Sequence, residues 1–402
     1  MLRVARVLQC VLFVLLLAAA VVPEPAPHDP LPRMVNGLAA TPPMGWNAYN
    51  AYGLTATETV IRETADAMVA TGLREAGYVY VNIDDGWMAP TRDAAGNLQP
   101  SPERFPHGIA VLADYVHARG LKLGIYEDAG VQTCGGWPGS LGHERQDAAL
   151  FASWGVDYLK YDNCYAGRGC PAQDCRSAVA LPAVQRYTAM RDALLATGRP
   201  IVFSICNWGT EHVWRWGSGY GNLWRTTGDI LPTYASMLSI FHDTVGLSGY
   251  AGPGGWNDPD MLETGNGMTA LEDRTEVSLW AAMAAPLIVG TDVVHATAAT
   301  VSALTNPAVV AVDQDSLGRP ARVVSSVSGL DVLARPLAGG DVAVVLFNET
   351  SAVATIATTT ADVGAPGSTL RDLWTGTTTT TTSVISATVQ PHGVVMYRVS
   401  RS

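Results

Sequence analysis

Acidic and polar side chains recur at one kind of position in this 402-residue sequence, directly after short apolar runs. Because only 15% of the residues are charged, such a gathering of charge is informative. Carboxylates grouped with aromatic rings suit glycoside hydrolysis. In that reaction one carboxylate attacks the sugar or activates water, a second protonates the leaving oxygen, and an aromatic face stacks on the sugar. The residues at these positions are Trp46, Asp84, Asp85, Tyr126, Asp128, Lys160, Asp162, Asn207, Arg225, Asp229 and Asp260.

Lys160 is one of only two lysines among 25 cationic residues, and it precedes Asp162 by two positions. On a β-strand, residues two apart point to the same side. We therefore expect the Lys160 ammonium to keep Asp162 ionised and to bond a sugar hydroxyl. Asp84 and Asp85 are consecutive, so a regular strand cannot point both to one side, and we expect the chain to bend there.

The elements that must position these residues are short apolar runs, which alternate with helical patterns from about residue 41 onward. This alternation is typical of parallel strands covered by helices. Eight such units, without a Gly-rich phosphate loop, favour an α/β fold of the (β/α)₈ TIM-barrel type over an open doubly wound sheet. Catalytic groups of TIM barrels project from the C-terminal ends of the strands. The expected strands are residues 44–48, 78–84, 121–126, 156–161, 201–205, 223–227, 247–250 and 287–289.

The character of the sequence changes near Arg319. The remaining chain is rich in Val and Thr and lacks helical periodicity, which predicts a small C-terminal antiparallel β domain. The run Thr377 to Thr382 fits a flexible or glycosylated linker, or an exposed strand or hairpin, which β-branched Thr favours. We expect the barrel over residues 31–320 and the β domain over residues 321–402.

The first 30 residues have the features of an export signal followed by a Pro-rich segment. Arg3 and Arg6 precede an apolar run over residues 7–22, which is shorter than the roughly 20 residues of a membrane-spanning helix. We expect this segment to be cleaved and the protein to be secreted, without membrane attachment. The net charge of -11 argues against nucleic-acid partners, whereas a neutral sugar is indifferent to it.

The sequence has six cysteines, of which Cys10 lies in the export signal. The other five are an odd number for an oxidising compartment, and two disulfides with one buried thiol would account for them. Cys170 and Cys175 lack zinc-finger spacing and no paired His motif occurs, so we expect no metal site.

Six segments, in order, closely resemble the melibiase family, glycoside hydrolase family 27, which contains α-galactosidases and α-N-acetylgalactosaminidases. The resemblance covers most of residues 41–320, and DLWTG (372–376) and PHGVVMYRV (391–399) extend it to the end. It implies a (β/α)₈ barrel followed by an antiparallel β domain, an α-galactoside substrate, and no metal or organic cofactor. The six segments are TPPMGWNAYN (41–50), VNIDDGW (81–87), LGIYEDAG (123–130), YLKYDNC (158–164), WRTTGDI (224–230) and GGWNDPDML (254–262).

The same resemblance implies roles for the site residues. Asp162 would be the nucleophile and Asp229 the acid/base of a retaining exo-glycosidase. Asp162 should then titrate low beside Lys160 and Arg225, while Asp229 stays protonated near the working pH. The positions that match sugar-binding residues of the family are Trp46, Asp84, Asp85, Tyr126, Lys160, Arg225 and Asp260.

The chain departs from the family at Asn207, where many relatives carry Glu, and this puts one sugar contact in doubt. Two close alternatives are an α-N-acetylgalactosaminidase and a β-L-arabinopyranosidase. A third is a non-catalytic carbohydrate-binding protein, which the presence of both Asp162 and Asp229 disfavours. The family's acidic pair, here Asp84 and Asp85, contacts the 4- and 6-hydroxyls and so favours galactose over arabinopyranose. Asn207 fills much of the volume of a Glu, which favours galactose over its N-acetylated analogue.

Cys134 follows the third expected strand and Cys164 the fourth, and the loops after neighbouring strands approach each other. This placement and the family resemblance both indicate a Cys134–Cys164 disulfide. Cys170 and Cys175 would then close a tight loop, leaving Cys206 reduced inside the barrel.

Overall fold

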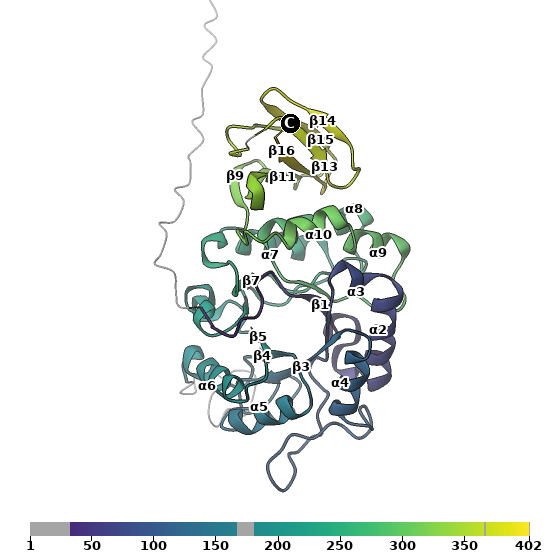
Figure 1. Cartoon of the computed structure of the whole chain (residues 1–402), viewed down its shortest axis with the longest axis vertical. Helices are drawn as coiled ribbons and strands as arrows, with labels where there is room; N and C mark the ends of the chain where they lie inside the picture. Colours follow the sequence, from purple (N-terminus) through teal and green to yellow (C-terminus); the bar gives the residue numbers. More distant parts are fainter. Residues whose placement is uncertain (1–32, 167–180, 366, 402) are drawn as a thin grey trace, which may run out of the picture. The chain divides into compact units, whose positions relative to one another are not determined.

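The structure is a computed structural model, and it describes residues 33–166, 181–365 and 367–401 (Figure 1). The expected export signal lies outside these residues. Among the helices that are described, none combines the length and the apolar character needed to cross a membrane.

A ring of parallel strands forms the centre of the N-terminal part (Figure 1). Hydrogen bonds link them in the order β7-β6-β5-β4-β3-β2-β1-β8. The ring closes between β8 and the segment after β7, because the Leu262 N–H donates to the Ile288 carbonyl (2.8 Å) and the Gly290 N–H donates to the Leu262 carbonyl (2.9 Å). The expected TIM barrel is therefore confirmed. Its strands are β1 (Met44–Asn47), β2 (Tyr80–Asn82), β3 (Lys122–Asp128), β4 (Tyr158–Asp162), β5 (Val202–Ile205), β6 (Leu223–Arg225), β7 (Trp256–Asp258) and β8 (Leu287–Val289).

Helices surround this ring and bury one face against it. In α2 the Thr57 side chain accepts the Val60 N–H as an N-cap, and Ile61, Ala65 and Met68 are buried at helical spacing. The α-helices are α1 (Tyr49–Tyr52), α2 (Glu58–Ala70), α3 (Leu73–Ala76), α4 (Ile109–His117), α5 (Glu144–Ser153), α6 (Ala183–Ala196), α7 (Tyr234–Val245), α8 (Ala270–Met283), α9 (Ala298–Leu304) and α10 (Pro307–Asp313). Short 3₁₀ turns are η1 (Gly53–Thr55), η3 (Thr210–Arg215), η4 (Gly217–Gly219), η5 (Ser248–Tyr250) and η6 (Ala338–Gly340).

Strand alternation divides the barrel interior into an apolar layer and a polar layer. The apolar cluster contains Tyr80, Tyr158, Val202, Leu223 and Trp256, each at or near the start of its strand. Residues two positions further along point to the same side, so polar side chains lie above this layer. These polar residues include Asn82, Lys160, Ser204, Arg225 and Asp258, which line a small internal cavity.

The expectation for the seventh strand was wrong. Residues 247–250 do not form a strand; Ser248–Tyr250 is a 3₁₀ turn, and the seventh strand is Trp256–Asp258. An apolar run did not mark it because only Trp256 is apolar. Asn257 has polar partners instead, since it accepts from Trp224 Nε1 (2.8 Å) and donates to the Leu247 carbonyl (2.8 Å).

The C-terminal part of the described chain is antiparallel, as expected. It forms a six-stranded sheet in the order β14-β13-β16-β11-β10-β9 and a two-stranded sheet of β12 and β15. The Thr-rich run gives an exposed strand, β14, paired with β13. The bounds are β9 (Arg322–Val327), β10 (Leu330–Pro336), β11 (Val342–Asn348), β12 (Ala354–Thr359), β13 (Thr369–Asp372), β14 (Thr378–Thr380), β15 (Val384–Val389) and β16 (Val394–Ser400).

Both faces of β11 are buried, which explains its unbroken apolar sequence. Val345 and Phe347 belong to the same hydrophobic cluster as the barrel helices. Val344 and Leu346 point to the other side and pack in a second cluster with Ile356 of β12 and Ile385 of β15.

Candidate active site

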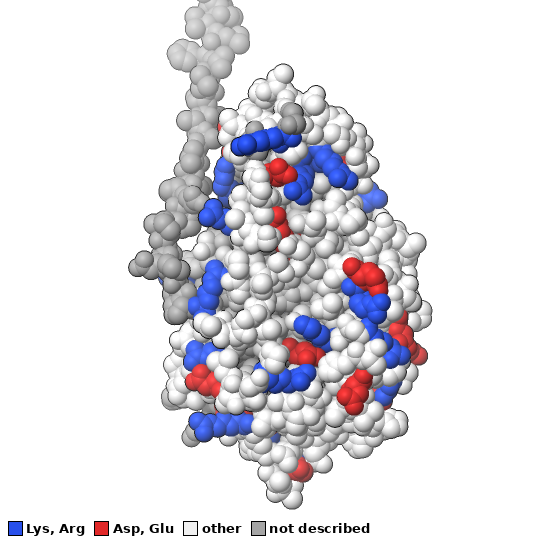
Figure 2. Space-filling model, in the orientation of Figure 1, with Lys and Arg blue, Asp and Glu red and all other residues white. Residues whose placement is uncertain are grey.

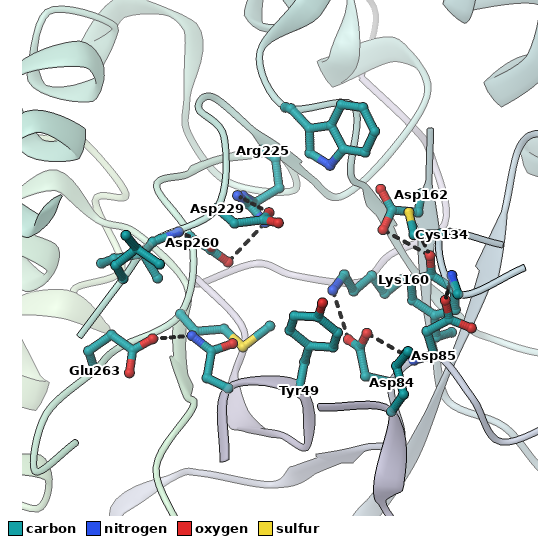
Figure 3. A pocket seen from close by; sticks show the side chains of 18 of the residues that line it. Tyr49, Asp84, Asp85, Cys134, Lys160, Asp162, Arg225, Asp229, Asp260 and Glu263 are labelled. Carbon is teal, nitrogen blue, oxygen red and sulfur yellow. Dashed lines mark hydrogen bonds and ion pairs between the residues drawn. The ribbon is translucent and has the colours of Figure 1, made fainter. Parts of the chain in front are cut away.

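A pocket of about 470 Å³ lies where the barrel strands end (Figure 3). Arg225, Asp229 and Asp260 lie on one side of it, Asp85, Cys134 and Asp162 lie on the other, and Lys160 is between them. The lining residues are Tyr49, Asn50, Leu54, Asp84, Asp85, Tyr126, Cys134, Gly135, Lys160, Asp162, Trp208, Arg225, Asp229, Ile230, Leu231, Pro232, Asp260, Met261, Glu263 and Asn266.

Asp162, the last residue of β4, is buried, with only 6% of its surface exposed. The Tyr126 hydroxyl of β3 donates to its Oδ2 (3.0 Å). Lys160 shares its side of β4, as expected, but its Nζ pairs directly with Asp84 Oδ2 (2.7 Å) and not with Asp162. Asn47 Nδ2 also donates to Asp84 Oδ2 (2.8 Å). Asn47 of β1 and Lys160 of β4 thus hold Asp84, while Tyr126 of β3 holds Asp162.

Asp229 is on the loop after β6, and its side chain is 66% exposed. Arg225 Nη2 lies 3.1 Å from Asp229 Oδ1, and Arg225 Nη1 lies 2.9 Å from Asp260 Oδ1. The Ile230 N–H donates to Asp260 Oδ2 (2.9 Å). These contacts fasten the loop after β6 to the loop after β7.

The protonation preferences of the two candidate catalytic carboxyls are the reverse of the expectation. Burial raises the pKa of Asp162, and the lowering effect of Lys160 does not cancel it. Burial would also raise the pKa of Asp229, but Arg225 and Lys160 lower it below 3.8. The expectation was wrong because Lys160 binds Asp84 directly, while Arg225 binds the exposed Asp229.

Asp85 reaches the pocket because β2 ends at Asn82, before the acidic pair, and Gly86 takes a positive φ of 87°. Its Oδ2 accepts the Gly135 N–H (2.7 Å) and its Oδ1 accepts the Gly86 N–H (2.7 Å). Burial raises the pKa of Asp85 to about 6, although these N–H groups oppose the shift. The expected bend of the chain is present.

The Cys134–Cys164 disulfide joins the loops after β3 and β4, with the two Cα atoms 5.2 Å apart. This confirms the expected pairing. Cys206 is a free, buried thiol, also as expected. Cys170 and Cys175 lie outside the described residues. Donor atoms of Asp128, Cys134, Asp162 and Cys164 lie within 4.8 Å of one another, but the disulfide occupies two of them.

Two of the expected sugar-binding residues do not line the pocket. Trp46 is fully buried and its Nε1 donates to the Thr291 carbonyl (2.8 Å). Asn207 is also fully buried, and its Nδ2 donates to the Thr210 carbonyl (2.8 Å). Asn47 and Cys206, their chain neighbours, line the internal cavity, so alternation points Trp46 and Asn207 away from the barrel interior.

Several lining residues were not anticipated from the sequence. Tyr49 lies within the first family-like segment, three residues after Trp46, and Trp208 follows Asn207 with a positive φ of 56°. Glu263 directly follows the last such segment and accepts from Asn266 Nδ2 (2.5 Å) and from Asn50. Their position in or beside the family-like segments could have indicated them. Side chains in loops, however, do not follow the regular repeat of a strand or helix, so the sequence does not show which way they point.

Carboxylates at the end of β4 and on the loop after β6, lining one pocket at the C-terminal mouth of a barrel, fit the class of barrel glycoside hydrolases. The family model described as Alpha galactosidase A matches residues 41–315. A second model, the Alpha galactosidase C-terminal beta sandwich domain, matches residues 327–399. The chain belongs to the α-galactosidase A family.

Individual relatives cover nearly the whole chain. The α-galactosidase of Cyamopsis tetragonoloba is 50% identical over 368 residues, which are 90% of this chain and 87% of that protein. The crystal structure of α-galactosidase I from Mortierella vinacea is similar with a TM-score of 0.85 at 37% identity, covering 92% of this chain and 99% of that one. The structure of α-galactosidase from Saccharomyces cerevisiae with raffinose has a TM-score of 0.83 at 31% identity, covering 92% and 100%.

Proposed function

We propose that this enzyme is a retaining exo-α-galactosidase, which releases terminal α-linked D-galactose by double displacement. The observation that carries the proposal is the placement of Asp162 at the end of β4 and of Asp229 on the loop after β6, both lining one pocket. Retaining glycosidases use such a pair, one carboxylate as nucleophile and the other as acid and then base.

Asp162 is suited to the nucleophile role because it is buried and oriented by the Tyr126 hydroxyl (3.0 Å). It attacks the anomeric carbon and forms a covalent galactosyl–enzyme ester as the glycosidic C–O bond breaks. Asp229 is suited to the acid/base role because its exposed loop can reach the leaving oxygen. It donates its proton to that oxygen and later takes a proton from the water that hydrolyses the ester.

The remaining pocket residues support recognition of one terminal sugar. Asp84 and Asp85 offer carboxylate acceptors, and Lys160 and Arg225 offer donors. Galactose differs from arabinopyranose by its 6-hydroxymethyl group, and buried acceptors penalise a sugar that leaves them unpaired. We propose that Asp84 and Asp85 take the 4- and 6-hydroxyls. Asn207 does not line the pocket, so its volume gives no support for rejection of an N-acetyl group.

Hydrolysis of three p-nitrophenyl glycosides tests the substrate. We expect kcat/KM for α-galactose to exceed that for α-N-acetylgalactosamine and for β-L-arabinopyranose by at least tenfold, which requires about 1.4 kcal/mol of transition-state binding. The Asp162→Asn variant is the matched inactive control. Comparable rates on the N-acetylated sugar, or a preference for the pentoside, would contradict the galactose assignment and leave the mechanism standing.

We also propose that residues 1–30 are removed on secretion, that the catalytic barrel spans residues 31–320, and that residues 321–402 form the β domain. Support for the signal comes from its sequence alone. The domain limits agree with the two family matches, over residues 41–315 and 327–399.

A further inference from the structure

We propose that Leu231 is the centre of an apolar leaving-group surface, so that the enzyme favours α-galactosides whose aglycone presents alkyl or aryl surface. The surface consists of Leu231 and Pro232, which are exposed and line the pocket. This inference rests on the proposed function, because it names which galactosides the same pocket prefers.

Leu231 is held in place although its side chain has little contact with the protein. It is 62% exposed. Its N–H donates to the Ser236 Oγ in the first turn of α7 (2.9 Å), and its carbonyl accepts the Thr233 N–H (2.7 Å). Thr233 is itself the N-cap of α7. The backbone around Leu231 is therefore fixed by a helix, and the leucine is presented at the mouth of the pocket in a defined position.

Leu231 is two residues from Asp229, the proposed proton donor, and both line the pocket. The acid/base must contact the glycosidic oxygen, which joins the galactose to its leaving group. A side chain on the same short loop is then within reach of the leaving group. The Ile230 N–H, between them, donates to Asp260 Oδ2 (2.9 Å), so the loop cannot easily swing away.

Exposed Pro232 extends this surface beside Leu231. Met261 also lines the pocket, but it is only 6% exposed and lines the internal cavity as well, so it belongs to the floor. Gly267 approaches Pro232 so closely that a Cβ would lie 3.0 Å from the Pro232 carbonyl oxygen. The ionic groups Asp84, Lys160, Asp162, Arg225 and Asp260 are mostly buried in the strand ends. The pocket thus has a charged floor for the sugar and an apolar side of the mouth.

Single exposed leucines are common on protein surfaces and need no explanation. Leu195 of α6 is such a residue, since it is 45% exposed and does not line this pocket. It provides a matched control for the same substitution.

The test compares n-propyl and glyceryl α-galactosides, which have nearly the same size and differ by two hydroxyl groups on the aglycone. We expect the wild-type kcat/KM to be about fivefold higher for the n-propyl galactoside, from partial burial of its methylene groups. Leu231→Asn should bring the two values within twofold of each other, and Leu231→Ala should give an intermediate ratio. Leu195→Asn should keep the wild-type ratio, and free galactose should inhibit all variants equally.

The inference would be overturned if the wild-type kcat/KM for the n-propyl galactoside were equal to or lower than that for the glyceryl galactoside. It would also be overturned if Leu231→Asn kept the wild-type ratio of the two values. A loss of preference in Leu195→Asn would do the same, because the effect would then not belong to the pocket. Failure of the proposed function looks different: neither galactoside is hydrolysed and galactose does not inhibit.

Discussion

Asp162 and Asp229 serve one reaction from opposite environments. Asp162 is buried, and this burial raises its pKa. The Asp229 side chain is only partly withdrawn from water, and the Arg225 guanidinium outweighs that raising effect and lowers its pKa. A bound sugar would cover the exposed Asp229 carboxylate and take it out of water. Desolvation disfavours the ionised form, so substrate binding should raise the pKa of Asp229 and prepare it as an acid.

These directions predict two pH effects with separate origins. Asp162 must be ionised to attack, so kcat/KM falls in acid for every substrate, and with α-galactosyl fluoride its raised pKa puts this fall at a higher pH than an ordinary aspartate would. Asp229 must be protonated, and its lowered pKa makes kcat/KM fall toward neutral pH only when the leaving group needs a proton. We expect methyl α-galactoside to show both effects. With α-galactosyl fluoride, whose fluoride ion leaves without being protonated, we expect only the acidic loss.

Two variants serve as controls for this assignment. Asp229→Asn should reduce kcat/KM for the methyl galactoside by roughly 10²–10⁴-fold while largely sparing kcat/KM for the fluoride. Asp162→Ala should abolish hydrolysis of both. An alkaline loss of equal size with the fluoride would show that another group titrates.

At the residue scale, the residue types in the site were easier to predict than the directions in which their side chains point. Asp84, Tyr126, Lys160 and Arg225 were expected in the pocket and line it. Trp46 was also expected there, but it points into the surrounding helices. The two-residue period of the strand would have excluded it, because its neighbour Asn47 occupies the inward position.

At the element scale, apolar runs marked most of the barrel strands, because these strands bury both faces. They failed at β7, where Asp258 reaches the polar layer of the barrel interior and Asn257, on the other side, bonds to Trp224 and to the Leu247 carbonyl. The loops after the strands were least predictable, since their conformations depend on particular contacts. An example is the loop after β3, where the Gly135 N–H donates to Asp85.

The Cys134–Cys164 disulfide should control both stability and sugar binding, because it fixes that loop. Removing a crosslink between residues 30 positions apart should lower the free energy of unfolding by roughly 3–4 kcal/mol. In a Cys134→Ser, Cys164→Ser variant we also expect weaker inhibition by galactose, since Gly135 would no longer hold the Asp85 carboxylate. Activity and galactose inhibition should be measured at a temperature where circular dichroism shows the variant folded.

The Cys206→Ser variant is the comparison, since it removes a buried thiol that forms no disulfide. A double variant that is less stable but binds galactose like the wild type would show that the disulfide is only structural.

At the scale of the whole molecule, the barrel and the C-terminal sheets share buried surface. Phe347 of β11 packs in the barrel cluster, and Trp374 Nε1 donates to Ser278 Oγ of α8 (2.9 Å). Arg335 of β10 is buried and donates to the carbonyls of Ala281 and Asp313. On the face that Figure 2 shows, blue and red side chains are scattered among uncharged ones.

Three buried carboxyls predict that the protein is more stable in acid than in alkali. Burial raises the pKa of Glu276 and of Asp313 to about 8 each, and that of Asp331 to about 7. Between the unfolded value near 4 and these folded values, the native state binds more protons than the unfolded state, so stability falls as pH rises through about 7 to 8. We expect the melting temperature to be several degrees lower at pH 9 than at pH 5.

Glu276→Gln isolates one contributor, because glutamine keeps the shape of the side chain and cannot ionise. The Glu263 N–H donates to Glu276 Oε1 (3.0 Å) and the Thr264 hydroxyl donates to Oε2 (2.7 Å), and a glutamine can satisfy both positions if the Thr264 hydroxyl accepts. The variant should show a smaller fall in melting temperature between pH 5 and pH 9, while Glu103→Gln, at an exposed position, should fall like the wild type. If the melting temperature of Glu276→Gln falls as much as that of the wild type, the alkaline loss of stability arises at other groups. A wild type with a higher melting temperature at pH 9 than at pH 5 would contradict the prediction.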